Sequence, residues 1–373
     1  MSPYAHITGW GVAVPERILT NDDIAKMVGT NDEWIFSHTG IHERRVAADN
    51  QTSASLATDA ALQALQVAGL NPTSIDLIIV STSSPEHFFP ATACLVQDRI
   101  GATRAGAFDL SAACSGFIFA MNMASQAIQT GSIRSALVIG TETLTRLVDW
   151  EDRNTCILFG DGAGAFVLQA NPEPGGVHAA LMRSDGSGGD LLILPSPGSR
   201  YPVSIKNIEN GLQYVQMNGR EVFRFATRVM AQATEEVLGK AGFKLEDIQW
   251  IIPHQANLRI IEAAAKGLKF PMEKIVVNIE RYGNTSTASI PLATVEAIED
   301  GRIKPGDRIV FVGFGAGLTW GALVATWSGP FPAHRRKFRR RTVRFLARLR
   351  SALLRLLRRI DALVWGRLSG ISR

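Results

Sequence analysis

Two stretches of the chain share the same order of sequence signals. Residues 57–80 read ATDAALQALQVAGLNPTSIDLIIV, and residues 230–252 read MAQATEEVLGKAGFKLEDIQWII. Each is a helical pattern that stops at a glycine, Gly69 or Gly242, and continues through a polar turn into Ile-x-x-Ile-Ile. Generic α/β periodicity is the plainer explanation, but glycine, turn and strand agree in their order. The chain is therefore predicted to consist of two similar halves.

Apolar runs of strand length alternate with helical patterns in both halves. The strand-like runs lie at 77–80, 136–139, 165–168, 250–252, 274–277 and 308–312, and the long helical patterns at 53–68 and 221–241. This alternation predicts an α/β fold with mainly buried strands. We expect an N-terminal half over 1–171, a C-terminal half over 172–327 and an extension over 328–373. The sequence Asn-Pro-Glu-Pro-Gly-Gly at 171–176 is the predicted connector between the halves.

Charge is divided unevenly between the body and the extension. Of the 39 Lys and Arg residues, 14 lie in 328–373 beside one acid, Asp361, although the net charge of the whole chain is only +5. Residues 335–341 read RRKFRRR, and apolar residues then recur three or four positions apart, at Leu346, Leu349, Leu353, Leu356, Ile360 and Leu363. The pattern predicts a basic amphipathic helix over 335–368.

Three partners fit such a helix. An anionic membrane surface is the interpretation that we favour. A coiled coil, or docking on the acidic body, is the second. Binding of nucleic acid is the least favoured, because a basic run alone is a weak signal for it.

Composition also excludes several kinds of site and location. The three cysteines, Cys94, Cys114 and Cys156, have no paired spacing, which argues against a disulfide framework and against a zinc site. The N-terminus shows no basic region followed by an apolar run, and no run of about 18 apolar residues occurs. We therefore expect a cytoplasmic protein that attaches peripherally to the inner face of the membrane through its extension.

Cys114 stands where a nucleophile is favoured. In FDLSAACSGF, residues 108–117, an apolar run ends in small residues and a helical pattern begins at Phe117. Backbone N–H groups and the macrodipole at a helix N-terminus stabilise a thiolate, so we expect the pKa of Cys114 to be lowered. A buried cysteine that acts as a small hydrophobe is the alternative, and we expect that role for Cys94 and Cys156.

Two polar residues with a place for chemistry lie in the second half. In IIPHQAN, residues 251–257, an apolar strand delivers His254 past its C-terminal end, where open α/β sheets bind ligands. In YGNTSTASIP, residues 282–291, Asn284 offers amide N–H donors that do not titrate, and an apolar strand is expected before it. Taken singly, a structural histidine or a turn asparagine is the plainer interpretation.

Two glycine-rich segments complete the pattern. The sequence GFGAGLTWG at 313–321 predicts a turn whose backbone amides supply half of an oxyanion hole. A dinucleotide fingerprint is a poor alternative for it, because no crossover unit with a distal acid follows. For FGDGAGA at 159–165 we favour close packing of strands over a nucleotide loop.

These features together resemble the β-ketoacyl-[acyl-carrier-protein] synthase III family, the initiating condensing enzymes of type II fatty-acid synthesis in the thiolase superfamily. The similarity runs from about His6 to Trp327. The matching segments are NDEWI (31–35), TGI (39–41), AACSGF (112–117), FGDGAG (159–164), PHQAN (253–257), GNTS (283–286) and TWG (319–321). The resemblance implies a homodimer of five-layer αβαβα protomers, each built from two similar halves.

The resemblance implies a reaction and a role for each central residue. Cys114 would take an acyl group from acyl-CoA, and malonyl-acyl-carrier protein would then lose CO₂ and condense with it. His254 and Asn284 would bind the enolate oxygen, and the backbone N–H groups of Cys114 and Ala316 would bind the tetrahedral oxyanion. No metal or redox cofactor is implied. Malonyl-CoA as the second substrate stays open.

Neighbouring activities are less well matched. Biosynthetic thiolases use a second, late cysteine, and none follows Cys156. Elongating synthases use a second histidine where Asn284 stands, and plant-type polyketide synthases share the three residues but not the flanking motifs. A specialised-pathway enzyme with another acyl donor or acceptor is the alternative function. A membrane-bound scaffold without turnover is the second alternative, against which the intact Cys114 and His254 argue.

The resemblance also assigns residues to CoA. Trp34 and Arg153 occupy the positions between which the family holds the adenine ring. The family often has an arginine four residues after this tryptophan, and here that position is His38. A basic contact to CoA is therefore weakened.

Three further residues match a pocket or a docking region. Phe89 matches a residue that reaches the acyl pocket across the dimer interface, with core packing as the alternative. Asn257 and Arg259 match the region that docks the carrier protein, which is acidic and would attract Arg259. An arginine that is merely solvated is the alternative for Arg259.

Overall fold

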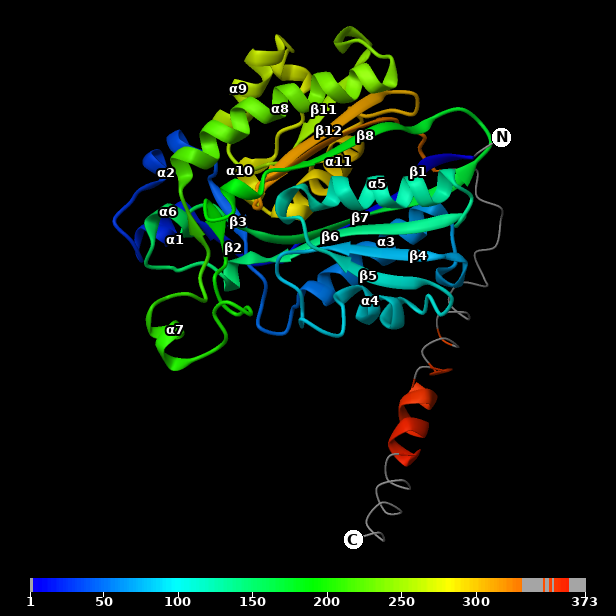
Figure 1. Ribbon diagram of the computed structural model, residues 1–373, viewed down its shortest axis with the longest axis horizontal. Helices are drawn as coiled ribbons and strands as arrows, with labels where there is room; N and C mark the ends of the chain where they lie inside the picture. The colour runs from blue at the N-terminus through cyan, green and yellow to red at the C-terminus, as the bar shows by residue number, and fades with distance from the viewer. Residues whose placement is uncertain (1–2, 331–344, 346–348, 351, 362–373) are drawn as a thin grey trace.

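Helices and sheets alternate in five layers in the computed structural model, which describes residues 3–330, 345, 349–350 and 352–361 (Figure 1). The first sheet has five strands in the order β1-β7-β6-β4-β5. Their bounds are Tyr4–Ala13 (β1), Asp161–Asn171 (β7), Ser135–Thr143 (β6), Leu77–Ser81 (β4) and Gly106–Leu110 (β5). The second sheet has four strands in the order β11-β12-β13-β8. Their bounds are Trp250–Pro253 (β11), Arg308–Gly315 (β12), Thr319–Thr326 (β13) and Gly176–Ser184 (β8).

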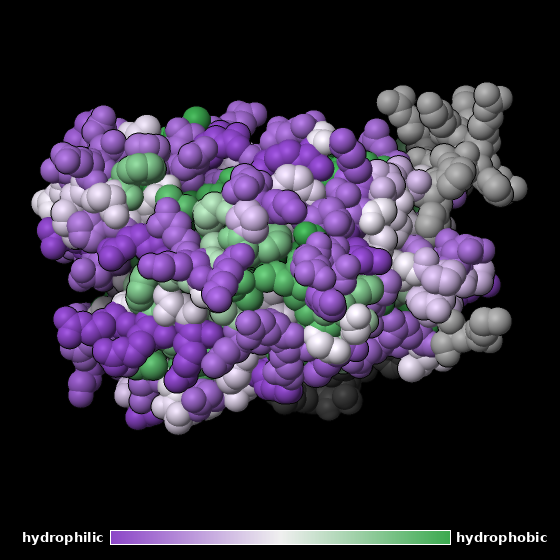
Figure 2. Space-filling view, turned by 90° about the horizontal axis from the view of Figure 1, so that it is seen from above, coloured by the Kyte–Doolittle hydropathy of each residue, from purple (hydrophilic) through white to green (hydrophobic). Residues whose placement is uncertain are grey.

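Three pairs of helices form the other layers, one pair between the two sheets and one pair on the outer face of each. The middle layer, α5 (Gly116–Gln129) and α11 (Ser289–Glu299), contacts strands of both sheets. The outer layers are α3 (Ser53–Ala68) with α4 (Thr92–Ile100) on the first sheet, and α8 (Gly219–Ala241) with α9 (Leu258–Leu268) on the second. Seen from the α8 and α9 side, the surface is mainly hydrophilic, with a smaller apolar area near its middle (Figure 2). The five-layer fold is the one that the sequence predicts.

The repeat has a structural counterpart in the two outer helices α3 and α8. Each ends at a glycine in the left-handed conformation, Gly69 or Gly242, with a φ of 71° in both. A short 3₁₀ turn follows each glycine, η1 (Pro72–Ser74) or η5 (Leu245–Asp247), and leads into β4 or β11. The two halves therefore use the same unit, helix, glycine stop, turn and central strand, once in each sheet.

Glycines of the 159–165 segment allow close packing, as predicted, but against helices α10 (Ile279–Tyr282) and α11 and not between a pair of strands. Gly162 and Gly164 lie in the buried strand β7. A Cβ atom added at Gly164 would lie 2.7 Å from Pro291 of α11, and one at Gly160 would lie 2.2 Å from the Tyr282 carbonyl oxygen. A side chain at Gly164 would push α11 of the middle layer off the first sheet, and one at Gly160 would displace the end of α10.

Two sequence predictions about strands are wrong. The run at 274–277 forms only the end of a 3₁₀ turn, η6 (Met272–Lys274), and a single bridge between Ile275 and Ile251. The residues before Asn284 form a short helix, α10 (Ile279–Tyr282), rather than a strand. In both cases the apolar residues are buried against neighbouring elements, so their burial explains the pattern without a strand.

The basic extension lies mostly outside the described residues. Residues 352–361 are helical, and Leu353, Leu356 and Ile360 are exposed on them. Arg355 donates to Asp98 of α4 at 2.6 Å. The helix predicted over 335–368 therefore stays a prediction. Within the described part of the chain, no helix is both long and apolar enough to span a membrane.

Candidate active site

Cys114 lies at the junction between the first sheet and the middle layer. It belongs to a 3₁₀ turn, η2 (Ala113–Ser115), between the end of β5 and the start of α5. Ala113 has a φ of 45°, a left-handed conformation that is unfavourable for a residue other than glycine. Strained backbone of this kind clusters at functional sites, where the surrounding structure holds it in place. Because η2 leads directly into α5, the predicted position of Cys114 at a helix N-terminus is confirmed.

The expected pKa of Cys114 is wrong in direction. The thiol is buried, and burial raises its pKa to about 12. The Ser286 hydroxyl lowers this pKa, but the loss of solvation outweighs it. A helix N-terminus stabilises a thiolate by a modest amount, whereas removing water from a charge costs more. Cys156 is buried as expected, while Cys94 is exposed on α4, contrary to expectation.

His254 follows β11 directly, and its backbone N–H donates to the Val312 carbonyl at 2.8 Å. The side chain is 1% exposed, and burial lowers its pKa to about 3, so the imidazole is neutral at neutral pH. Nδ1 lies 2.7 Å from the Ser289 hydroxyl. Nε2 is buried and has no hydrogen-bond partner within the described residues. An unpartnered buried nitrogen of this kind is available to a ligand.

Asn284 is fixed so that its amide nitrogen is the free end. Its backbone N–H donates to the Leu158 carbonyl at 2.8 Å, and its carbonyl accepts from the Gly160 N–H at 3.0 Å. The side-chain oxygen Oδ1 accepts from the Ser286 N–H at 2.8 Å. Ser286 has a φ of 47°, the second strained residue at this site. With Oδ1 engaged, the Nδ2 group is the donor left for a ligand.

Close backbone packing brings these segments together at the end of β12. A Cβ atom added at Gly315 would lie 2.6 Å from the Cys114 backbone nitrogen. One added at Gly313 would lie 3.2 Å from the His254 Cβ and 3.8 Å from the Cys114 carbonyl oxygen. The nucleophile turn and the histidine therefore both lie against β12, and only glycine leaves them room.

A mainly apolar cavity of about 90 Å³ opens onto Cys114, Ser286 and Ala316. The rest of its lining comes from segments far apart in the chain: Ser83, Ala113, Leu144, Leu147, Phe159, Leu192, Ile193, Leu194 and Val215. Sequence reasoning missed this lining. The run LLIL at 191–194, set in a glycine- and serine-rich stretch, is the signal that was available.

Trp34, Arg153 and His38 form a cluster on α2 (Asp32–Thr39) and its neighbour α6 (Arg153–Cys156). The Arg153 guanidinium lies 4.5 Å from the Trp34 ring centre, and the His38 ring stacks on Trp34 with centroids 4.4 Å apart. Arg153 also donates to the Gly29 carbonyl at 3.2 Å. The three residues that the family resemblance assigns to CoA lie together, and the His38 ring covers the indole.

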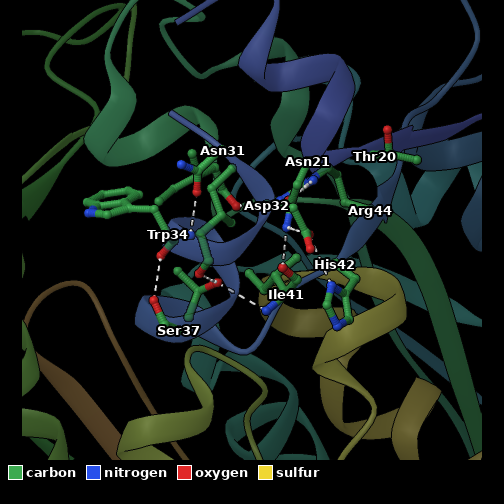
Figure 3. A network of polar contacts seen from close by, with 12 residues as sticks. Thr20, Asn21, Asn31, Asp32, Trp34, Ser37, Ile41, His42 and Arg44 are labelled. Carbon is green, nitrogen blue, oxygen red and sulfur yellow. Dashed lines mark hydrogen bonds and ion pairs between the residues drawn. The ribbon is translucent and has the colours of Figure 1, made fainter. Parts of the chain in front are cut away.

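A polar network behind α2 holds this cluster in place (Figure 3). Asn21 donates to Asp32 at 2.8 Å and to the Ile41 carbonyl at 2.6 Å, and it accepts from the buried Arg44 at 2.8 Å. Arg44 also donates to the Ile157 carbonyl at 2.7 Å, one residue before the Leu158 that binds Asn284. The network therefore connects the Trp34 helix with the Asn284 loop.

The remaining predicted residues lie apart from the cavity. Asn257 caps α9 by accepting from the Arg259 N–H at 2.9 Å, and it donates to the His38 carbonyl. Arg259 is exposed, with its guanidinium 5.8 Å from the Phe223 ring centre. Phe89 is 87% exposed, which excludes core packing within the chain.

Comparison with known proteins gives one family. A family model described as 3-oxoacyl-[acyl-carrier-protein (ACP)] synthase III matches residues 108–186, and the model of its C-terminal part matches residues 238–327. The β-ketoacyl-[acyl-carrier-protein] synthase III of Symbiobacterium thermophilum is 54% identical over 86% of this chain and 97% of its own length. The solved synthase III of Aquifex aeolicus VF5 is 47% identical, with a TM-score of 0.81 over 87% of this chain and 100% of its own. A priming β-ketosynthase from the R1128 polyketide pathway is 34% identical, with a TM-score of 0.84 over 88% of this chain and 98% of its own.

Proposed function

This chain belongs to the β-ketoacyl-[acyl-carrier-protein] synthase III family, the condensing acyltransferases that initiate type II fatty-acid synthesis, and we propose that Cys114, His254 and Asn284 carry out its reaction. The observation that supports these roles is the convergence of three segments. Cys114 lines one cavity with Ser286, whose N–H fixes the Asn284 side chain, and Gly313 lies against both the His254 Cβ and the Cys114 carbonyl. The chain is 54% and 47% identical to the two β-ketoacyl-[acyl-carrier-protein] synthase III enzymes and 34% identical to the polyketide enzyme. The higher identity to the synthase III enzymes disfavours a role in a specialised pathway.

In the loading step, the Cys114 sulfur attacks the thioester carbon of acyl-CoA. The bond from that carbon to the CoA sulfur breaks, and the thiol proton ends on the departing CoA. The backbone N–H groups of Cys114 and Ala316 stabilise the tetrahedral oxyanion, because the end of β12 packs against the Cys114 backbone. Trp34 and Arg153 hold the adenine, and Arg153 must leave the indole face to admit it.

In the condensation step, malonyl-acyl-carrier protein loses CO₂ and its thioester oxygen becomes an enolate. His254 Nε2 and Asn284 Nδ2 donate to that oxygen. The enolate carbon attacks the acyl group, the bond to the Cys114 sulfur breaks, and the sulfur takes up a proton. The product is a 3-oxoacyl-acyl-carrier protein, and no metal or redox cofactor enters any step.

This role requires one tautomer of His254. A neutral imidazole carries a single ring proton, and Nε2 must carry it in order to donate. Nδ1 is then an acceptor, so the Ser289 hydroxyl at 2.7 Å must donate to it. Ser289 could instead donate to the Ser286 carbonyl at 2.8 Å, which would leave Nε2 without a proton. The role proposed for His254 therefore requires that the Ser289 hydroxyl donates to Nδ1 and not to the Ser286 carbonyl.

The exposed edge of the first sheet suits a second copy of the chain. β5 is an edge strand, Phe108 on it is 40% exposed, and the neighbouring Phe88 and Phe89 are 73% and 87% exposed. We place these residues in a homodimer interface, with Phe89 entering the partner's acyl cavity. Arg259 and the α9 N-terminus are the proposed contact for the acidic carrier protein.

Intact mass tests the central assignment. Wild-type protein is incubated with acetyl-CoA and longer acyl-CoAs, beside Cys114→Ala. A single acyl adduct on the wild type, absent from the variant, is the expected result, and the adduct yield ranks the starter chains. An adduct that persists in Cys114→Ala would overturn the assignment of the nucleophile.

An anionic membrane surface is the proposed partner of the extension. Leu349, Leu353, Leu356 and Ile360 are spaced as one helical face, and each is about half exposed. Arg350, Arg355, Arg358 and Arg359 lie among them. Apolar burial at the lipid boundary and attraction to acidic headgroups act together on such a sequence. Full-length protein should sediment with anionic vesicles at low salt and not with neutral ones; no sedimentation with either would refute the proposal.

A further inference from the structure

Glu142 is a completely buried carboxyl group close to the nucleophile that the proposed reaction does not use. It lies on β6 in the centre of the first sheet and is 0% exposed. Its oxygens contact the β4–α4 loop of the first half and the Asn284 loop of the second. Glu142 thus connects the two halves beside the Cys114 cavity, which Ser83 and Ser286 line.

Three donors surround Oε2, of which the Thr82 hydroxyl is the most distant, at 3.4 Å. The Ser84 hydroxyl lies 2.6 Å from Oε2 and itself accepts from the Thr143 N–H at 2.8 Å, so its own proton points to Glu142. The Ser83 N–H lies 3.1 Å from Oε2 and also 3.1 Å from Oε1. Oε2 is therefore an acceptor in every arrangement of protons.

Oε1 has a different partner. The Thr287 hydroxyl lies 3.0 Å from Oε1 and 2.9 Å from the Ser81 carbonyl oxygen. A hydroxyl has one proton, and the Ser81 carbonyl can only accept it. If Thr287 donates to Ser81, the contact with Oε1 becomes a hydrogen bond only when Oε1 carries a proton.

We infer that Glu142 is a positioning residue that joins the two halves as a neutral acid, with its proton on Oε1 directed to Thr287 Oγ1. Burial raises the pKa of Glu142, which agrees with the neutral form. No Lys, Arg or His within the described residues forms an ion pair with it, and a buried carboxylate without a cation is strongly disfavoured.

The neutral form has a consequence for the nucleophile. A negative charge on Glu142 would add to the effect of burial in raising the pKa of the Cys114 thiol. The Ser286 hydroxyl, whose residue lines the Cys114 cavity, lowers the pKa of both groups. A protonated Glu142 keeps the two loops joined without placing an anion next to the sulfur that must become nucleophilic. This consequence depends on the proposed role of Cys114, whereas the protonation state does not.

Glu142→Gln is the direct test, because glutamine copies the proposed arrangement. Its oxygen replaces Oε2 and its NH₂ group replaces the protonated Oε1. Asp161→Asn is the matched control. Asp161 is also buried, but both of its oxygens accept backbone N–H groups, from Ala47 at 2.8 Å and Thr145 at 2.9 Å. Whichever oxygen of Asp161 is replaced by NH₂ in Asp161→Asn, that group would face a backbone N–H donor and could not accept from it.

Three measurements on the full chain follow. The infrared spectrum of wild type should show the carbonyl stretch of a protonated carboxyl that Glu142→Gln lacks. The alkylation rate of Cys114 by iodoacetamide at fixed pH, followed by peptide mass spectrometry to separate Cys94, should change by less than about twofold. Glu142→Gln should unfold in urea at nearly the wild-type midpoint, whereas Asp161→Asn should unfold earlier.

An ionised Glu142 would give other results. Glutamine would then remove a negative charge beside the thiol, and Cys114 alkylation would rise several-fold, roughly tenfold per unit of thiol pKa. Absence of the infrared band, faster alkylation, or unfolding of Glu142→Gln as early as Asp161→Asn would each overturn the inference. Failure of the proposed reaction would appear differently, as a wild-type protein that alkylates normally but forms no acyl adduct.

Discussion

At the residue scale, the site contains a buried thiol, that of Cys114, and a buried neutral imidazole, that of His254. The pKa of Cys114 is raised to about 12 and that of His254 is lowered to about 3, so an ion pair between them is not the resting state. In the proposed reaction, a neutral His254 would act as a hydrogen-bond donor rather than as an acid. Activation of the thiol then depends on the substrate and on the oxyanion donors.

Ser289→Ala should impair condensation and leave loading intact. Without the hydroxyl, nothing holds the His254 proton on Nε2, so we expect condensation to slow by at least about tenfold, less than the ~10²–10³ for loss of a whole oxyanion donor. Single-turnover assays separate acyl adduct formation from 3-oxoacyl product formation. Ser125→Ala, which removes a buried hydroxyl within α5, is the control. Equal rates in Ser289→Ala and wild type would contradict the tautomer assignment.

His254 should also make stability depend on pH. Its folded pKa of about 3 lies below the ordinary histidine pKa of 6.5, so the unfolded state binds more protons between these values. Stability is therefore complete above pH 6.5 and falls as the pH decreases through this window, by about 2 kcal/mol at roughly pH 5. Urea unfolding of wild type and of His254→Gln, each at roughly pH 5 and at roughly pH 7, measures this loss of stability. Parallel pH slopes in the two proteins would show that His254 does not contribute.

At the element scale, the end of β12 is the surface against which the nucleophile turn is fixed. Its glycines let the strand approach the Cys114 backbone, and the same approach places Ala316 at the cavity. The requirement is steric and local to these positions. A glycine elsewhere in the fold need not share it.

Gly315→Ala should therefore abolish acyl loading. The added Cβ would meet the Cys114 nitrogen at 2.6 Å, so the turn or the strand must move. Gly239→Ala in α8 is the matched control, since an added Cβ there meets nothing within 4 Å. We expect that control to load normally and to gain up to about 1 kcal/mol from helix propensity. Normal loading by Gly315→Ala would refute the packing argument.

At the scale of the whole molecule, the family fold ends before the basic extension begins. The C-terminal family model ends at residue 327, and Trp327 is a buried part of the core between the sheets. The described contact from the extension to the body is the exposed ion pair between Arg355 and Asp98. Such surface pairs contribute at most about 1 kcal/mol.

A chain that stops after Pro330 should retain enzymatic activity and should no longer bind anionic membranes. We expect acyl loading within about twofold of the full-length rate and a melting temperature within a few degrees, because the ion pair described between the extension and the body lies on the surface. Vesicle sedimentation, acyl loading and calorimetry on both proteins check this. Vesicle binding that survives the truncation would place the membrane contact on the body instead.

The sequence by itself determined the α/β class and the repeated unit of helix, glycine stop, turn and strand. Helix stops at Gly69 and Gly242, and the strand that delivers His254, are local signals that neighbouring residues encode. The strand predicted at 274–277 is wrong because these apolar residues are buried without pairing into a sheet, apart from a single bridge. The family resemblance supplied the roles of Trp34 and Arg153, which no local pattern would have shown.

Only the tertiary structure decided the chemistry around those residues. The direction of the Cys114 pKa depends on how completely other segments exclude water, and this is a sum over the whole fold. The acyl cavity and the contacts of Glu142 join segments that are more than a hundred residues apart in the chain. Desolvation and such long-range packing leave no periodic trace in the sequence, whereas helix ends and buried strands do.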